Sequence, residues 1–250
     1  MSGQPTRAGV SPPTDPSESN SWVPTEWRRF SAFLRNPVLP DRATLSLGKS
    51  VRALVPLFVL DLILMGLVLG GIELATRLGM HMPHHMLEDL QLTPVLIAFM
   101  VIGAPLGEET LFRGWLSGRP GHIAAVLALL TGFATFAFGP TEIVKLAGAL
   151  VALVIAAVAL FAFRKRDAFG FFQRHFRWFY IASVLLFAGI HLTNFAGAGF
   201  SPTLLPLVLP QLLLALILGY LRVNRGLLTG AALHMLHNTL FVGLMLAGVK

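Results

Sequence analysis

The sequence predicts an all-α membrane protein, a polytopic bundle of about seven transmembrane helices with the N-terminus inside and the C-terminus outside. Hydrophobic residues make up 55% of the chain and charged residues only 12%, about half the ~25% charged share of a typical globular protein. The mean hydropathy is +0.72, and several apolar stretches approach the roughly 20 residues that cross a bilayer as a helix. The formal net charge of +7 then indicates basic loops beside anionic lipid headgroups rather than a nucleic-acid partner. The absence of cysteine excludes disulfide scaffolds, thiol nucleophiles and thiolate metal sites.

The N-terminal 50 residues precede the first apolar segment. Residues 1–19 are rich in Pro, Ser, Thr and Gly, so they cannot bury enough surface to offset their ordering entropy, and we expect a disordered tail. This tail has no apolar core of the kind that a cleavable signal peptide needs. In the juxtamembrane segment 20–50, Trp27, Phe30 and Leu34 recur at helical spacing beside several arginines. The segment is either an amphipathic helix in the membrane interface or a linker with incidental aromatic residues.

Residues 51–250 form the predicted transmembrane domain. Its apolar segments have the length of helices, whereas barrel strands would be about half as long and alternate in polarity. Gly103 and Gly107 have the spacing that lets helices approach closely in lipid. We expect spans near residues 52–76, 92–112, 122–139, 143–163, 178–197, 203–221 and 226–247.

The distribution of Lys and Arg predicts the orientation. With the N-terminus inside, sixteen of the 19 basic residues fall on the inner side, as the positive-inside rule requires. The outer side holds only Arg77, Lys145 and Lys250.

Ionisable residues within the spans are candidates for function, because each costs free energy in hydrocarbon. Asp61 and Glu73 are isolated. The stretch GAPLGEETLFRGWL, residues 103–116, is the first of three polar clusters. In a helix, Glu109 and Arg113 are one turn apart and can form an ion pair. Glu108 would then be free to face a cavity as a base, although a purely structural network between helices explains the same residues.

The second and third clusters lie on later spans. FAGIHLTNF, residues 187–195, contains His191, and LHMLHN, residues 233–238, places His234 and Asn238 on one helix face. His237 is near that face too, so the sequence leaves open which histidine points at a site. A carboxylate, imidazoles and an amide from three helices could activate water and stabilise an oxyanion, or bind a metal.

Together these motifs resemble the CPBP family of intramembrane proteases, which contains the type II CAAX prenyl endopeptidases and the Abi bacteriocin-immunity proteins. The resemblance rests on three motifs in order: EExxxR (Glu108, Glu109, Arg113), FxxxH (Phe187, His191) and HxxxN (His234, Asn238). It covers about residues 92–247. The chain departs from the family in an inserted helix pair around 122–163, which preserves the relative direction of the motif helices.

The resemblance implies an intramembrane endopeptidase acting on a peptide or lipidated-protein substrate in the bilayer. Glu108 would be the general base, His191 would hold the water, and His234 and Asn238 would stabilise the oxyanion, with Glu109 and Arg113 in support. The family also admits zinc, for which Glu108, His191 and His234 would be the ligands, although the chain has no HExxH helix. The immunity branch and the missing signal peptide imply a bacterial inner membrane.

Two other functions remain open at this point. The buried Glu and His residues could form the proton or ion relay of a transporter or channel, although the sequence shows no paired repeats. The protein could also be a non-catalytic immunity or scaffold protein. Separately, HMPHHM (His81, His84, His85) is either a metal-binding loop or a solvated one.

Overall fold

The computed structural model describes residues 22–86, 90–195 and 202–248. The prediction of a disordered tail at 1–19 lies outside these residues. Within them the chain is helical and contains no strand. Seven helices are long and apolar enough to cross a membrane, which confirms the predicted all-α, multi-span fold and makes this an integral multi-pass membrane protein.

The helices that could cross a membrane begin and end within a few residues of the predicted bounds. Their termini follow ordinary helix signals: Pro94 and Pro120 start helices at positions where a missing N–H is harmless, and Gly226 separates the last two. Four spans are single helices: Leu47–Arg77 (α2), Pro120–Phe138 (α5), Glu142–Ala162 (α6) and Leu227–Leu246 (α10). The span Phe176–Asn194 consists of α8 (Phe176–Ile190) and η6 (His191–Asn194), and the span Leu204–Arg225 consists of most of η7 (Pro202–Val208) and α9 (Leu209–Arg225). The second span, Pro94–Ser117, runs from α3 to η5 and is described with the site.

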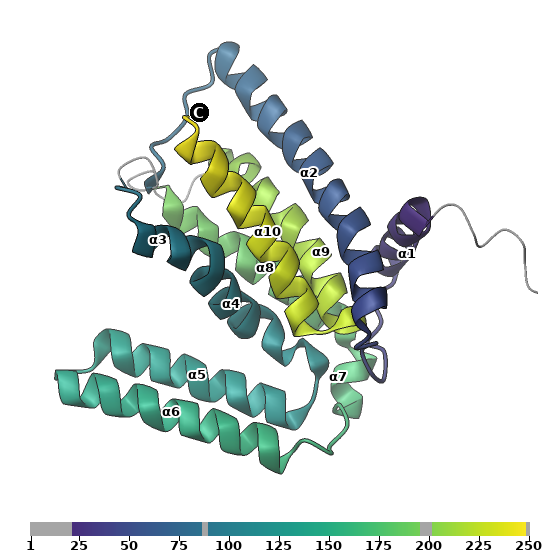
Figure 1. Cartoon of the computed structure of the whole chain (residues 1–250), viewed down its shortest axis with the longest axis vertical. Coiled ribbons are helices and arrows are strands. Elements are labelled where there is room, and N and C mark those ends of the chain that lie inside the picture. The colour runs from purple at the N-terminus through teal and green to yellow at the C-terminus, as the bar shows by residue number, and fades with distance from the viewer. Residues whose placement is uncertain (1–21, 87–89, 196–201, 249–250) are drawn as a thin grey trace, which may run out of the picture.

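The centre of the bundle is α9, whose span is more buried than any of the other six. It packs against α2, α8 and α10, and Figure 1 shows these helices side by side. Leu218 and Leu221 on α9 are fully buried, together with Leu57 of α2 and Leu233 of α10. Large apolar side chains stay exposed on the outer faces of the spans, as expected where lipid is the solvent.

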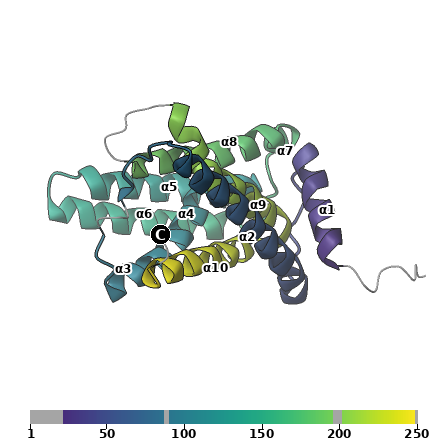
Figure 2. The ribbon, with the colours of Figure 1, turned by 90° about the horizontal axis from the view of Figure 1, so that it is seen from above.

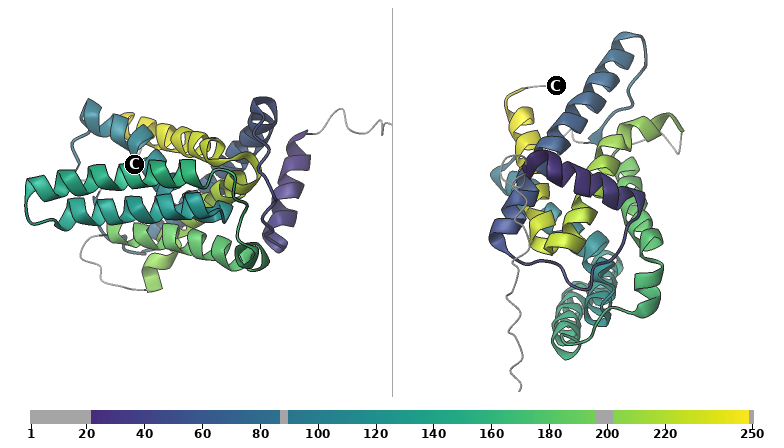
Figure 3. Two further views of the ribbon diagram at one scale, coloured as in Figure 1. Left: turned by 90° about the horizontal axis from the view of Figure 1, so that it is seen from below. Right: turned by 90° about the vertical axis from the view of Figure 1, so that its right-hand side faces the viewer.

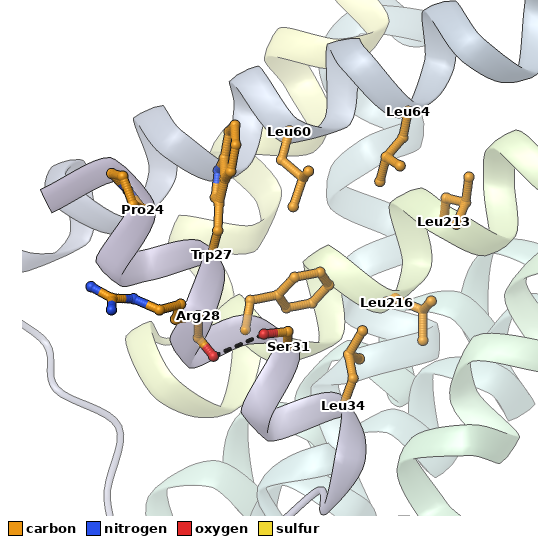
Figure 4. Close-up of a pocket in the computed structure, with 10 residues that line it drawn as sticks. Pro24, Trp27, Arg28, Ser31, Leu34, Leu60, Leu64, Leu213 and Leu216 are labelled. Carbon is orange, nitrogen blue, oxygen red and sulfur yellow. Dashed lines mark hydrogen bonds between the residues drawn. The ribbon is translucent and has the colours of Figure 1, made fainter. Parts of the chain in front are cut away.

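Before the spans, α1 (Trp22–Arg35) is a helix, as the amphipathic interpretation of this segment requires. It lies across the bundle (Figure 3, right). The Trp27 Nε1 donates to the Pro56 carbonyl at 2.7 Å, and the Tyr220 hydroxyl donates to the buried Glu26 carboxylate at 2.7 Å. The apolar stripe of α1 therefore packs on α2 and α9, around an apolar cavity of about 600 Å³ (Figure 4). Its position in the membrane interface stays a prediction.

The inserted pair, α5 and α6, forms a hairpin at the edge of the molecule opposite α1 (Figures 1 and 2). Small residues make the two helices fit. A Cβ added to Gly132 would lie 2.4 Å from the Ala152 Cβ, and one added to Gly148 would lie 2.4 Å from the Thr135 Cγ2. The hairpin meets the bundle chiefly where α5 contacts the end of the second span. A short helix, α7 (Gly170–Arg174), then leads into α8.

Two basic residues that the positive-inside count assigns to inner connections lie within membrane spans. Arg113 is fully buried and Arg222 is 8% exposed, and both lie inside spans rather than in inner connections. Removing them leaves fourteen basic residues on the predicted inner side against three on the outer side. The asymmetry is still large, and the inside position of the N-terminus remains a prediction.

Candidate active site

The second span is an irregular helix, and this irregularity positions the first polar cluster. Short α-helices, α3 (Pro94–Ala98) and α4 (Ala104–Glu108), alternate with π-helical turns, η3 (Phe99–Gly103) and η4 (Glu109–Arg113), before a 3₁₀ turn, η5 (Gly114–Ser117). Pro105 has no N–H to donate. Such π-helical turns are rare and occur often at functional sites.

Neighbouring helices bind the carbonyl groups that this irregular backbone frees. The Asn238 Nδ2 donates to the Met100 carbonyl at 2.8 Å, and the Ser183 hydroxyl donates to the Phe112 carbonyl at 2.7 Å. Arg222 donates to the carbonyls of Arg113 and Gly114, each at 2.8 Å. Since an unsatisfied carbonyl is costly in a membrane, these side chains hold the irregular span in one conformation.

Glu109 is the buried member of the carboxylate pair. Its Oε1 accepts from the Arg113 Nη1 at 2.6 Å, with both side chains fully buried, as the one-turn spacing predicts. The same Oε1 lies 3.1 Å from the His234 Nδ1. The Arg113 guanidinium also stacks 4.0 Å from the centre of the Phe187 ring, a favourable cation–π contact. Glu109 therefore has two partners, Arg113 and His234, and its role is to hold the second span and α10 together.

α10 passes very close to this carboxylate. Gly230 lies one turn before His234, and a Cβ added there would be 3.3 Å from the Glu109 Oε2. A larger residue would push α10 away from the second span. The glycine thus lets His234 reach Glu109.

Glu108 lies in a different environment. Its side chain is 30% exposed, and its Oε2 lies 3.7 Å from the His234 Nε2. This distance is too long for a direct hydrogen bond, but a water molecule could bond to both atoms. The ring of His234 therefore connects the two carboxylates, with Nδ1 toward Glu109 and Nε2 toward Glu108.

His191 joins the same cluster from the end of α8. Its Nδ1 lies 2.7 Å from the Phe187 carbonyl, so Nδ1 is the donor and Nε2 is free to accept. The Phe187 ring contacts His191 and His234, with ring centres 4.7 and 5.7 Å away.

The distance of His191 along its helix does not prevent this approach. At about 1.5 Å per residue, His191 lies roughly 22 Å from the start of α8, and Glu108 about 13 Å from the end of the second span. Side chains on a helix tilt toward its N-terminus, and these two helices run in opposite directions. The His191 and Glu108 side chains therefore lean toward each other.

The structure distinguishes the two histidines of the third cluster. His234 faces the carboxylates, whereas the His237 Nδ1 lies 2.7 Å from the Oδ2 of Asp61, a fully buried residue of α2. His237 thus joins α10 to α2. Glu73, the other isolated acidic residue, is exposed and pairs with Arg77 at 2.7 Å.

Asn238 lies one turn beyond His234, between α10 and the second span. Its amide nitrogen gives one hydrogen to the Met100 carbonyl. A second amide hydrogen remains. Asn238 therefore links α10 to the second span and keeps one N–H group that can donate to another acceptor.

The residues of the cluster do not fit the zinc that the resemblance admits. Within residues 22–86, 90–195 and 202–248, no three His, Asp or Glu side chains are arranged to hold a metal ion. Glu108, His191 and His234 as placed do not form a zinc site, and we derive no step through a metal. The same holds for His81, His84 and His85, of which His85 packs edge-on against Phe195 at 5.0 Å.

Sequence reasoning missed two contributors to the site. Asp61 is recognisable as an acidic residue within a span, but its partner is 176 residues away. Arg222 looks like a loop cation from its position near the end of a span, although it binds the backbone of the EExxxR segment. Neither role has a local sequence signal.

Comparison with known proteins identifies a family for the part of the chain that contains these motifs. The model of the Rce1-like family, described as type II CAAX prenyl endopeptidase Rce1-like, matches residues 90–240. This range contains all three motifs and the inserted hairpin. No curated protein and no solved structure matches the chain. The family supports a CAAX-type intramembrane endopeptidase in general. The chain therefore belongs to the Rce1-like family of type II CAAX prenyl endopeptidases.

Proposed function

We propose that this protein hydrolyses a peptide bond with a water molecule activated by Glu108. The observation that carries the proposal is the difference between two adjacent carboxylates. Glu109 is fully buried and neutralised by Arg113, whereas Glu108 is 30% exposed and lies near His234. Glu108 is accessible and, in the part of the chain that the structure describes, is not held in an ion pair with an arginine, so its carboxylate is suited to accept a proton from water.

In the proposed reaction, Glu108 takes a proton from water while the water oxygen bonds to the carbonyl carbon of the scissile peptide. His191 accepts a hydrogen bond from this water through its free Nε2. The carbonyl electron pair moves onto oxygen, giving a tetrahedral oxyanion. As that intermediate collapses, the C–N bond breaks and Glu108 returns the proton to the leaving amine.

His234 and Asn238 are the proposed oxyanion donors. Glu109 accepts from the Nδ1 of His234 and fixes the ring; in this proposal the imidazolium form of His234, which carries a hydrogen on both nitrogens, donates from Nε2. The second amide hydrogen of Asn238 supplies another contact. Oxyanion donors of this kind are each typically worth roughly 10²–10³ in rate.

The proposed substrate is a peptide or lipidated protein whose scissile bond enters the site from the bilayer. The match to a prenyl-endopeptidase family supports this substrate class. We further propose a bacterial inner membrane as its location, on the resemblance to immunity proteins. No step of this mechanism needs a metal.

The test is hydrolysis of a peptide library, with prenylated and unprenylated members, by protein reconstituted in vesicles. Glu108→Gln keeps the size of the side chain but removes the base, so turnover should fall by at least the ~10²–10⁴-fold typical of general base catalysis. Peptide binding should persist. Glu73→Gln is the matched control, since Glu73 is exposed and far along another helix, and it should keep full activity.

Three results would contradict the proposal. Full hydrolysis by Glu108→Gln would remove Glu108 as the base. Loss of activity on chelation, with recovery on added zinc, would show a metal-dependent reaction. Ion flux that disappears in Glu108→Gln, without any peptide hydrolysis in the wild type, would instead indicate a transporter.

A further inference from the structure

A second polar feature lies at the end of the bundle where α9 runs into α10 (Figure 1). It is a cavity of about 840 Å³. Its walls come from the segment after α1, the start of α5, the chain after α6, the end of α9 and the start of α10. Helix ends surround it, so it lies at the level where the spans leave the hydrocarbon.

The charge of this cavity is strongly positive. Its lining includes a single acidic residue, Asp41. Against this stand six basic residues, Arg42, Arg119, Arg164, Lys165, Arg222 and Arg225. Such a concentration of like charge destabilises a fold unless an anion compensates it.

Carboxylates of the protein compensate these cations only weakly. Asp167 lies 4.0 Å from Arg119, and Glu26 lies 4.0 Å from Arg225. Arg222, 8% exposed, donates to backbone carbonyls and has no ion-pair partner among the described residues. The cavity can therefore accept negative charge from outside the protein.

Two helices add to this preference by starting at the cavity. Arg119 and His122 flank the start of α5, and Gly226, Leu227 and Leu228 form the start of α10. The N-terminus of a helix carries a partial positive charge and unpaired N–H groups, which favour anions.

Apolar side chains beside the cations indicate what kind of anion this is. Leu45 is 81% exposed and Leu228 is 78% exposed, and both line the cavity. A small water-soluble anion makes no favourable contact with exposed leucine side chains, whereas the acyl chains of a lipid lie directly beside its phosphate and can pack on them. Arginine in turn matches phosphate geometry with two parallel hydrogen bonds.

We propose that this cavity binds the phosphodiester headgroup of an anionic glycerophospholipid. Basic pockets between transmembrane helices bind such headgroups in other membrane proteins. The headgroup lies among the arginines, and its acyl chains run over Leu45 and Leu228. The cavity shares Arg222 with the backbone of the EExxxR segment, but Glu108, His191 and His234 do not line it, and its existence does not depend on the proposed hydrolysis.

Lipid retention by the purified full-length protein in neutral detergent tests the proposal. The probes are phosphatidylglycerol, phosphatidylcholine and inorganic phosphate, with bound lipid counted by native mass spectrometry and stabilisation followed by thermal unfolding. Phosphatidylglycerol should be retained and should raise the melting temperature. Phosphatidylcholine and inorganic phosphate should do neither.

A double variant, Arg42→Ala with Lys165→Ala, tests the cavity itself. Both side chains are exposed, so the variant should unfold like the wild type without lipid. Its apparent affinity for phosphatidylglycerol should fall roughly tenfold or more, since the loss of even one hydrogen bond between charged groups typically costs about that factor. Arg166→Ala with Arg174→Ala is the control, because it removes two exposed cations outside the cavity.

Two outcomes would overturn the assignment. An equal loss of affinity in the control variant would show attraction to surface charge in general. Inorganic phosphate that stabilises the protein as well as phosphatidylglycerol would identify a site for soluble anions instead.

Discussion

Glu108 and Glu109 are adjacent in sequence, yet their side chains lie in opposite environments. They point about 100° apart around their helix. Glu109 is enclosed by Arg113 and α10, whereas Glu108 keeps contact with open space. Glu108 can thus stay accessible beside a second carboxylate that its ion pair with Arg113 holds inside the protein.

The two histidines of α10 provide a residue-level prediction. His234→Ala removes the ring that faces Glu108, so kcat should fall by roughly 10²–10³. Its melting temperature should fall less than that of His237→Ala, because Glu109 keeps its pair with Arg113. His237→Ala instead leaves Asp61 buried without its partner, a loss that typically costs about 3–5 kcal/mol. Peptide hydrolysis and thermal unfolding, measured on both variants, separate the two roles.

The opposite pattern would contradict this assignment. If His237→Ala melted normally and lost turnover, His237 would be the residue that acts in the reaction. His234→Gln is a useful third variant, since it retains a hydrogen-bonding group beside Glu109.

At this scale the sequence predicts local pairs and leaves distant ones open. The ion pair of Glu109 and Arg113 follows from their spacing along one helix. The choice between His234 and His237 does not, because it depends on Asp61 and on the closeness that Gly230 permits. These partners lie on other helices, and their contact is decided by tertiary packing.

Among the elements, the second span shows how a membrane helix can be distorted when side chains of its neighbours bond the carbonyl groups that the distortion frees. Ser183, Arg222 and Asn238 supply donors from three neighbouring helices. Pro105 is the only local sign of this irregularity in the sequence. The positions of the π-helical turns depend on donors far along the chain, so hydropathy predicts the span but not its internal geometry.

The α5–α6 hairpin gives a prediction at the scale of elements. In Gly132→Ala the new methyl group would lie 2.4 Å from the Ala152 Cβ, so the helices must separate. Overpacking of this kind typically costs about 1–3 kcal/mol. Thermal unfolding in detergent should show a lower melting temperature.

Gly66→Ala is the control for this variant. It makes the same change inside α2, where nothing lies within 4 Å of the added Cβ, and alanine is favoured over glycine in a helix by about 1 kcal/mol. We expect Gly66→Ala to be neutral or stabilising. Equal destabilisation of both variants would mean that the hairpin contact is not the cause.

For the whole molecule, the charge asymmetry predicts the orientation in the membrane. The protein contains no cysteine, so single cysteines report their side without background. In spheroplasts, an impermeant maleimide should label Leu78→Cys, which is 80% exposed between α2 and α3. Arg166→Cys, exposed between α6 and α7, should react only after lysis.

The reversed labelling pattern would place the N-terminus outside. It would also move the positively charged cavity to the other face of the membrane. Labelling of both positions in spheroplasts would indicate that an even number of spans, and not three, lies between them.

The number and position of the spans could be predicted from the sequence because lipid imposes a minimum apolar length on each. The central place of α9 could not. Its composition resembles that of its neighbours, and its burial results from the way in which α2, α8 and α10 pack around it. The packing of α1 onto α2 and α9 likewise depends on partners that lie later in the chain, such as Tyr220.

The pairing of Asp61 with His237 has a consequence for how the protein is made. Glu109 and Arg113 emerge from the ribosome almost together and can neutralise each other at once. Asp61 emerges 176 residues before His237, so it must wait in a partly inserted chain until the last helix arrives. A chain that stops before α10 keeps a carboxylate without this partner within its first span, and a buried polar group without its partner destabilises the inserted chain.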